Sequence, residues 1–308
     1  MASRRRLVNW LLTSLAAAAE RVVVEYGISL RLTPESADQP TVVLVVGSDS
    51  RRGLTRRLRY LDHDIDDRRA DAIGLLIVPT EGSVALVRVS RDAFMSVAGV
   101  GFQRIGWALS YCGSQCLIDS IRRGMGVPVH HYLEIGFVPF ARLATSLGGL
   151  SSKRYAHRVD RRAGLDSPKR STIWGRQVLA LARSRTPGGQ QLTDIERVAM
   201  QNRILTDLAE RRSVLRLVIG TAAVAPRLGR DLLIDDALSA RGLRRMAAAI
   251  HDRRLEVLSL PLREIESGGS RRSPFATTFD SSSPVLELDA EAVAEVALLA
   301  GRGAPAGA

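Results

Sequence analysis

The spacing of apolar residues along the chain predicts alternating strands and helices. Continuous β-branched runs at residues 41–46 and 72–78 are typical of buried strands. The alternation at residues 84–90 predicts a third strand, which a Pro-Thr-Glu-Gly-Ser turn joins to the second as a hairpin. Helical spacing at residues 115–124 is followed by strand-like alternation at residues 130–136. The first half of the chain therefore supplies most of the predicted sheet.

The second half of the chain is predicted to be mainly helical. A helix at residues 137–147 is stopped by a Gly-Gly pair, and a polar, basic stretch covers residues 151–172. Thr193 and Glu196 form a capping-box pattern before an apolar run, which marks the start of a helix. The remaining predicted elements are strands at 256–262 and 285–289 and helices at 174–184, 193–217, 240–253 and 290–299, with a Ser-rich loop at 267–283. Strands and helices alternate from residue 41 to about residue 300, which predicts one α/β domain with helices on both faces of its sheet.

The first 40 residues have a different pattern from the rest of the chain. Arginines at positions 4–6 precede an apolar run at residues 7–19. This run is shorter than the roughly 20 residues of a full membrane span, but a basic segment followed by an apolar one suits a signal segment or a shortened membrane anchor. A surface helix that packs its apolar stripe on the domain is the alternative. The predicted organisation is an N-terminal segment with a linker at 1–40, a main domain at 41–300 and a disordered tail at 301–308.

An excess of basic residues indicates what kind of ligand the domain binds. The 308 residues include 44 Lys and Arg against 32 Asp and Glu, a formal net charge of +12, and Lys153 and Lys169 are the only lysines. With 45% hydrophobic residues the chain is too apolar for a disordered basic tail, and it lacks the long apolar runs of a polytopic membrane protein. Because guanidinium groups bind phosphate oxygens through paired hydrogen bonds, we expect a phosphorylated or otherwise anionic ligand.

Charged residues adjoin three of the predicted strands. Asp49 follows the first strand, Arg69 and Asp71 precede the second, and Arg91 and Asp92 follow the third. Ligand sites of α/β sheets usually lie at the rim where strand ends converge. Two carboxylates brought together there repel each other unless a divalent cation sits between them or one is protonated. Taken singly, each residue suits a turn cap or a surface ion pair equally well, so only their convergence would indicate a metal–diphosphate site.

A second basic group lies on predicted helices. Arg183 and Arg185 end one helix, and Arg197 and Gln201 are four residues apart, which places them on one face of the next. Arginines near a helix C-terminus also complement the helix dipole. A solvated surface is therefore the simpler interpretation of these residues taken alone.

The spacing of the two cysteines and the absence of nucleotide-binding motifs narrow the range of possible functions. Cys112 and Cys116 have no additional zinc ligands at a suitable spacing, so they form either a local disulfide outside the cytoplasm or two buried thiols inside it. The sequence contains no P-loop and no identifiable nucleic-acid-binding motif. Nucleic acid is therefore not an expected partner, although the charge would permit nonspecific binding.

Six segments of the chain, taken in order, resemble the LytR-CpsA-Psr family, which transfers cell-wall glycopolymers in bacteria. They are LVVGSDSR (44–51), RADAIGLLIV (69–78), VSRDAFM (89–95), GVPVHHYLEIGFVPFARLATSLGGL (126–150), WGRQVLALARSR (174–185) and TDIERVAMQNRIL (193–205). The resemblance covers roughly residues 41–205. One such segment would be weak evidence, whereas six in the right order are a specific signal.

The resemblance implies a fold, a location and a reaction. Members of the family have a three-layer α/β/α sandwich with a central mixed sheet, usually held on the extracytoplasmic face of the membrane by a short N-terminal anchor. The implied reaction is a Mg²⁺-dependent phosphotransfer, with Mn²⁺ as the alternative ion. It moves a glycopolymer from a polyprenyl-pyrophosphate carrier to a peptidoglycan hydroxyl, and the lipid leaves as its monophosphate. The expected partners are thus the lipid-linked donor, the peptidoglycan acceptor and the membrane surface.

By motif match, the resemblance also assigns roles to individual residues. Asp49 and Asp71 would hold the metal ion, and Asp92 would orient Arg91 or help to activate the acceptor hydroxyl. The residues expected to clamp the pyrophosphate are Arg69, Arg91, Arg183, Arg185 and Arg197, with Gln201 in support. This division suits phosphoryl transfer, because positioning and charge neutralisation dominate its catalysis.

The chain departs from the family pattern at three positions. Gly106 stands where Asn is usual, Thr145 where an Asp normally precedes the Gly-Gly turn, and Met200 where an Arg is expected before Gln201. The core carboxylates and most of the arginines are retained, so we expect activity, with an altered preference for donor or acceptor and a weakened or accessory copy as the alternatives that these departures leave open. Two other functions stay open: a pyrophosphatase that cleaves polyprenyl pyrophosphate with water, and a non-catalytic binder of lipid-linked anionic polymers.

Overall fold

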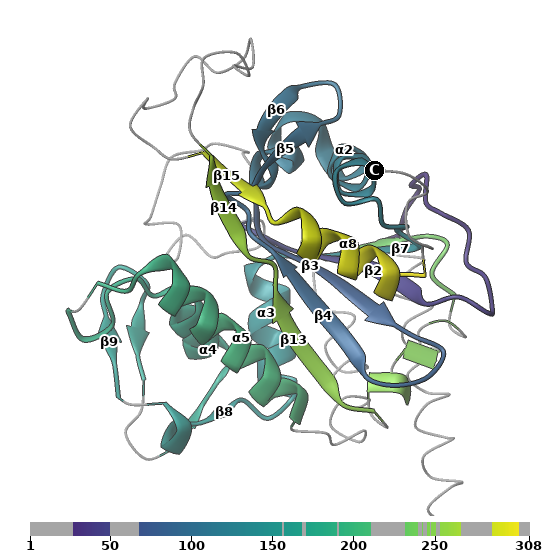
Figure 1. The fold of residues 1–308 in the computed structure, drawn as a ribbon. Coiled ribbons are helices and arrows are strands. Elements are labelled where there is room, and N and C mark those ends of the chain that lie inside the picture. Colours follow the sequence, from purple (N-terminus) through teal and green to yellow (C-terminus); the bar gives the residue numbers. More distant parts are fainter. Residues whose placement is uncertain are drawn as a thin grey trace, which may run out of the picture.

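A seven-stranded mixed sheet forms the centre of the computed structural model of the chain (Figure 1). Its strands β2 and β3 are antiparallel, whereas β2 and β7 are parallel. The strand order is β1 (Gly27–Ile28), β12 (Leu232–Asp235), β7 (His131–Ile135), β2 (Thr41–Ser48), β3 (Ala70–Val78), β4 (Val84–Val89) and β13 (Leu255–Ser259). The structure describes residues 27–49, 68–155, 157–167, 171–189, 191–210, 232–239, 253–265 and 285–301, together with 242, 245, 246 and 248–250.

Helices cover both faces of this sheet because its central strands present apolar side chains to both faces. Leu44 on β2 packs in the main hydrophobic core, with residues of helices α2 (Ala108–Met125) and α8 (Ala290–Leu299). Its neighbour Val43 belongs to a second cluster on the opposite face, together with Met246. The predicted α/β/α sandwich with a mixed central sheet is therefore confirmed.

Three further helices form a small layer that carries part of the predicted site. Helices α3 (Phe137–Ser146), α4 (Gly175–Arg183) and α5 (Asp194–Glu210) enclose a third hydrophobic cluster, and Figure 1 shows α4 and α5 side by side. The predicted capping box begins α5, since Thr193 and Glu196 exchange hydrogen bonds between side chain and backbone. Helix α4 therefore ends, and α5 begins, close to the residues predicted to clamp phosphate.

The predicted strands and helices agree with the structure except in a few segments. A hairpin of β5 (Phe94–Val97) and β6 (Gly101–Arg104) was not predicted, and α2 begins at Ala108 instead of residue 115. The strand predicted at 256–262 is two strands, β13 and β14 (Leu262–Ile265), and β14 pairs with β15 (Val285–Leu288). The remaining short elements are η2 (Ile105–Trp107), β8 (Leu150–Ser151), η3 (Ser152–Arg154), β9 (Val159–Asp160), β10 (Leu165–Asp166), β11 (Thr172–Ile173) and η4 (Pro187–Gly189).

Some predictions fall on residues outside the described ranges. They are the apolar run at 7–19, the loop at 267–283, the tail at 302–308, the end of the helix at 193–217 and much of the helix at 240–253. Within the described ranges, the chain contains no helix with the length and hydropathy needed to cross a bilayer.

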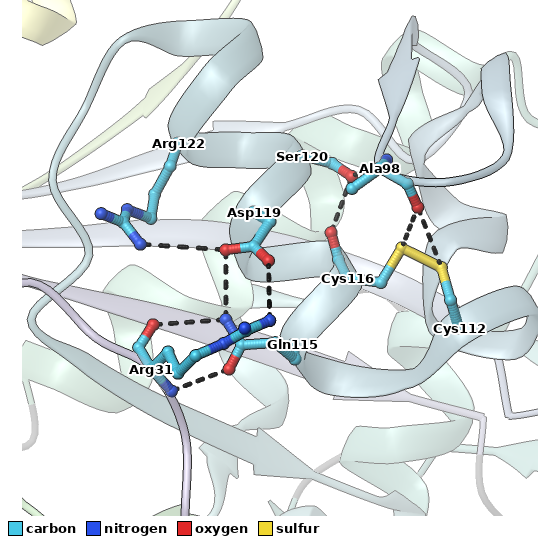
Figure 2. Close-up of polar contacts among 8 residues, drawn as sticks. All are labelled: Arg31, Ala98, Cys112, Gln115, Cys116, Asp119, Ser120 and Arg122. Atoms are coloured by element: carbon cyan, nitrogen blue, oxygen red, sulfur yellow. Dashed lines mark hydrogen bonds and ion pairs between the residues drawn. A yellow bond between two sulfur atoms is a disulfide. The ribbon is translucent and has the colours of Figure 1, made fainter.

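Helix α2 is interrupted near its N-terminus and joined across the interruption by a disulfide. Gly113 has φ 78° and ψ −172°, which a helix does not accommodate, and Cys112 and Cys116 are bonded on either side of it (Figure 2). The Ser120 hydroxyl donates to the Cys116 carbonyl at 2.7 Å and accepts from the Ala98 N–H at 3.0 Å. Of the two alternatives left open by the sequence, the structure contains the disulfide.

Candidate active site

A bulge between β2 and β3 shapes the rim at which the predicted residues lie. Gly47 pairs with Ala72 and Ser48 pairs with Ala70, so Asp71 is the additional residue of β3 at this point. Bulges redirect side chains and are common beside active sites. Asp71, predicted to precede the strand, thus lies within it. A Cβ at Gly47 would approach the Ala72 Cβ to 3.1 Å, so glycine lets the two strands pass closely here.

Both predicted metal ligands are engaged by arginines. The Arg69 backbone N–H donates to Asp49 Oδ1 at 2.7 Å, and the Arg69 Nε lies 3.8 Å from Asp49 Oδ2. The Arg91 guanidinium donates to Asp71 Oδ1, and its Nε lies 3.6 Å from Asp92 Oδ2. These side chains are only partly buried, with exposures from 20% for Asp49 to 44% for Arg69. A ligand can therefore reach the charged pairs and compete for the arginines.

Aromatic rings support two of the predicted clamp arginines. The Arg69 guanidinium carbon lies 4.5 Å from the centre of the Trp107 ring, and that of Arg183 lies 4.4 Å from the centre of the Phe137 ring. Phe137 directly follows β7, whose Ile135 pairs with Gly47. Arg183 on α4 is thereby brought to the same rim as Asp49. Cation–π contacts of this kind hold the guanidinium plane and leave its N–H edges available for an anion.

A buried carboxylate fixes the backbone that follows Arg183. Asp160 is 4% exposed, and its Oδ2 accepts from the Ser184 hydroxyl at 2.7 Å and from the N–H groups of Arg185 and Thr186 at 3.2 and 3.0 Å. Burial by itself raises the pKa of Asp160, but these bonds and one from the Ala163 N–H outweigh it and lower the pKa to about 2. Arg185 is therefore held through its backbone, and its side chain is exposed.

Gln201 contacts an arginine that the sequence prediction did not include. Arg88 on β4 is 9% exposed and donates to Gln201 Oε1 at 2.9 Å and to Asn202 Oδ1 at 3.1 Å. Gln201 in turn donates to the Ala182 carbonyl at 3.0 Å, one residue before Arg183. Burial, and then the positive charge of Arg197, lower the pKa of Arg88 to about 10. The buried Arg88 guanidinium thus joins β4 to α5, and Gln201 extends the connection to α4.

The structure places the predicted residues in three connected groups at one end of the sheet. Asp49 with Arg69 forms the first, and Asp71 with Arg91 and Asp92 the second. The third comprises Arg197 and Gln201, which both act on Arg88; Arg183 ends α4 and Arg185 follows it. Their roles in binding and catalysis stay predictions.

Four residues that shape these groups were missed by the sequence prediction. Arg88 interrupts the apolar alternation at 84–90, which is a signal that the sequence offers. Asp160 is one of few acids in a basic stretch, but the sequence does not indicate that it reaches Ser184. Trp107 and Phe137 have no local signal, because only the fold brings them to the arginines.

The three departures from the family pattern have structural roles here. The Gly106 N–H donates to the Arg91 carbonyl at 2.9 Å, and a Cβ at Gly106 would lie 2.9 Å from that oxygen. The Thr145 hydroxyl accepts from the Gly175 N–H at 3.1 Å and so ties α3 to α4. Met200 packs against the third hydrophobic cluster. Gly106 therefore lets η2 approach the backbone of a predicted site residue more closely than any larger residue would.

The chemistry of the donor set suits a Mg²⁺ ion that binds together with a phosphate ligand. Carboxylate oxygens are preferred ligands of Mg²⁺, which is commonly held by one or two carboxylates, substrate phosphates and water. Asp49 and Asp71 supply two such groups, Asp71 at the bulge of β3 and Asp49 directly after β2. In the part of the chain that the structure describes, no three His, Cys, Asp or Glu side chains converge as a metal site. The carboxylate chemistry of these two residues is compatible with Mg²⁺.

The structure is a mixed α/β/α sandwich with carboxylates and arginines gathered at one rim of its sheet, where the ligand sites of α/β proteins usually lie. The chain belongs to the LytR_cpsA_psr family, whose model matches residues 13–271.

Relatives and solved structures agree with this membership. The chain is 30% identical over 170 residues to the "Probable cell wall biosynthesis protein LcpB" of Corynebacterium glutamicum, over 54% of this chain and 40% of that protein. It is 30% identical over 118 residues to the polyisoprenyl-teichoic acid–peptidoglycan teichoic acid transferase TagU of Halalkalibacterium halodurans, over 38% of this chain and 35% of that one. The matched segments thus span less than half of either relative.

Solved structures show the same fold over nearly the whole chain. A LytR-Csp2A-Psr enzyme from Actinomyces oris superposes with a TM-score of 0.63 at 18% identity, covering 90% of this chain and 96% of that one. TagT bound to LIIa-WTA superposes with a TM-score of 0.61, also at 18% identity, covering 89% of this chain and 97% of that chain.

Proposed function

We propose that the chain is a phosphotransferase that moves a glycopolymer from a polyprenyl-pyrophosphate carrier to peptidoglycan. The observation that carries the proposal is the gathering of Asp49, Asp71 and Arg91 with the α4–α5 arginines at one end of the sheet. Membership of the LytR_cpsA_psr family and the likeness to teichoic acid transferases support the same reaction class.

In the proposed reaction, the arginines bind the pyrophosphate and Asp92 acts on the acceptor hydroxyl. A peptidoglycan hydroxyl oxygen attacks the phosphorus that carries the glycopolymer, and the bond from that phosphorus to the bridging oxygen breaks. The polyprenyl phosphate leaves, and Asp92 takes the proton of the hydroxyl. Arg91 lies beside Asp92 and Asp71, so it holds both carboxylates while it neutralises phosphate charge. A Mg²⁺ or Mn²⁺ ion held by Asp49 and Asp71 would neutralise further negative charge on the phosphates.

The reaction is proposed to take place on the extracytoplasmic face of the membrane. The partners proposed for it, a lipid-linked donor and peptidoglycan, meet at this surface. The Cys112–Cys116 disulfide supports the assignment, since disulfides persist in oxidising compartments. An N-terminal anchor that includes the apolar run at residues 7–19 belongs to the same proposal.

The test is a product analysis with a defined lipid-linked donor. The purified chain is incubated with Mg²⁺ and a synthetic polyprenyl-pyrophosphate oligosaccharide, with and without peptidoglycan fragments. We expect a peptidoglycan-linked product and polyprenyl phosphate only when the acceptor is present, and Arg183→Ala or Arg185→Ala is expected to lower turnover at least about 100-fold. Arg123→Ala, an exposed arginine near the end of α2, is the matched control and keeps full activity.

Three outcomes would count against this account. Transfer at the wild-type rate by both arginine variants would remove the site assignment. Polyprenyl phosphate released equally without acceptor would indicate a pyrophosphatase. Binding of the donor without any product would indicate a non-catalytic binder.

A further inference from the structure

Arg88 is a buried cation whose charge is not balanced by the described part of the chain. Its guanidinium donates to two neutral amides, Gln201 and Asn202, and none of the described carboxylates forms an ion pair with it. Its Nε is buried and has no hydrogen-bond acceptor among the described residues. The described residues thus satisfy part of the hydrogen bonding of this group and do not balance its charge.

Such an arrangement is unfavourable for the ligand-free protein. A buried charge is costly unless it is paired, and amide oxygens compensate for lost hydration only in part. Arg197, one helical turn before Gln201, lies close enough for its like charge to act on Arg88. The repulsion between two guanidinium groups in a partly desolvated place is offset when an anion binds between or beside them.

Arg88 also lies where the two halves of the candidate site meet. It lies on β4, three residues before Arg91, which follows the end of the strand, and its carbonyl accepts from the Leu260 N–H at 3.0 Å. Through Gln201 it is connected to the Ala182 carbonyl, next to Arg183. Because Val87 and Val89 belong to the core on the α2 face, the alternation of the strand directs Arg88 to the α5 face. Its charge is therefore central among the predicted clamp residues.

We propose that Arg88, together with Arg197, forms a subsite for one phosphate group of a diphosphate ligand. Arg88 acts through its positive charge, and the amides of Gln201 and Asn202 keep its guanidinium in place. The assignment to the diphosphate of a lipid-linked donor rests on the proposed function, whereas the affinity for inorganic pyrophosphate does not. Arg88 lies outside the six family-like segments, directly before the one at 89–95.

The test compares two substitutions that separate charge from hydrogen bonding. Arg88→Gln keeps a donor toward Gln201 and Asn202 but removes the charge, and Arg88→Lys keeps the charge. Binding of inorganic pyrophosphate, with orthophosphate in parallel, is measured by calorimetry on the full chain at constant ionic strength. Thermal unfolding of each ligand-free protein is measured alongside.

The subsite predicts opposite effects on binding and on stability. Arg88→Gln should bind pyrophosphate at least about tenfold more weakly than wild type, yet unfold at the same or a higher temperature, because an unbalanced buried charge has been removed. Arg88→Lys should bind within about threefold of wild type. Orthophosphate should show the same order of variants with weaker affinity throughout.

The proposal is overturned if Arg88→Gln binds pyrophosphate as wild type does. It is equally overturned if both variants lose binding and unfold at lower temperature, since a purely structural hydrogen-bonding role predicts that result. The transfer assay separates this inference from the proposed function. If pyrophosphate binding depends on the Arg88 charge but no transfer product forms, the subsite is supported and the proposed reaction is contradicted. If Arg88→Gln transfers with wild-type kinetics, the reaction is supported and the subsite is contradicted.

Discussion

Single buried charges position the candidate site, and Asp160 is the clearest example. Its carboxylate holds the Ser184 hydroxyl and two backbone N–H groups of the turn after α4. The pKa of Asp160 in the folded chain is about 2, below the usual value of an aspartate side chain. The stabilisation is therefore complete above the unfolded pKa and disappears as the pH falls from about 4 through about 2.

We predict that Asp160→Asn lowers the free energy of unfolding by about 2 kcal/mol at neutral pH. The difference from wild type should shrink as the pH falls from about 4 and vanish below about 2. Denaturant titrations between pH 2 and pH 7 measure it. Asp166→Asn, at an exposed acid of the same segment, is the matched control. A difference between Asp160→Asn and wild type that stays constant over this pH range would contradict the assignment.

At the scale of single residues, the sequence indicated which residues lie at the site better than it indicated which residues they contact. Asp71 and Arg91 were selected because they adjoin strands, and the structure pairs them. The bulge that makes Asp71 the additional residue of β3 has no local sequence signal, because it depends on the register with β2. For the same reason the contact of Asp160 with residues 184–186 was not predictable, since it joins segments about 25 residues apart.

Close packing of two helices sets the position of Arg183 at the scale of elements. Helix α4 begins at Gly175, and a Cβ there would lie 1.7 Å from the Ala141 carbonyl oxygen of α3. The Thr145 hydroxyl holds the same contact from the other side, with a bond from the Gly175 N–H. Arg183, at the far end of α4, stacks on Phe137 at the start of α3. The close packing at Gly175 and the stacking of Arg183 on Phe137 are therefore two ends of the same contact between α3 and α4.

We predict that Gly175→Ala destabilises the fold by about 1–3 kcal/mol and weakens pyrophosphate binding, because α4 must move away from α3. Thermal unfolding and calorimetry measure the two effects. Gly242→Ala is the control, since its Cβ would meet other atoms at 3.5 Å, an ordinary contact distance. If Gly175→Ala were as stable as wild type and bound pyrophosphate normally, the packing of α4 on α3 would not control the position of Arg183.

Strands with continuous apolar runs were predictable, whereas elements fixed by their neighbours were not. Strands β2, β3 and β4 agree with the predicted segments to within two residues, because burial on both faces gives a strong local pattern. The β5–β6 hairpin is short, and its turn depends on Gly99 and Gly101 with φ of 77° and 106°. Helix α2 starts earlier than predicted because Gly113 interrupts its pattern without ending it.

At the scale of the whole molecule, some of the excess arginines belong to the candidate site and the others lie elsewhere in the chain. Five arginines selected from the sequence, and Arg88 in addition, lie on β4, α4 and α5, shortly after β4 and α4, or directly before β3. The arginine-rich insertion at 51–59 lies outside the described residues. An anionic ligand was expected from charge alone, and the proposal that this ligand is a diphosphate is supported by how the fold gathers these residues with Asp49 and Asp71. The family match over residues 13–271 agrees with that expectation.

The most direct test of the proposed transfer follows each of the two phosphates of the donor. Two synthetic donors are prepared, one with ³²P on the phosphate attached to the glycan and one with ³²P on the phosphate attached to the lipid. After reaction with peptidoglycan fragments, we predict that the first label appears in the peptidoglycan product and the second in polyprenyl phosphate. Label from the first donor that stays on a free glycan phosphate, with none in peptidoglycan, would contradict transfer by this chain.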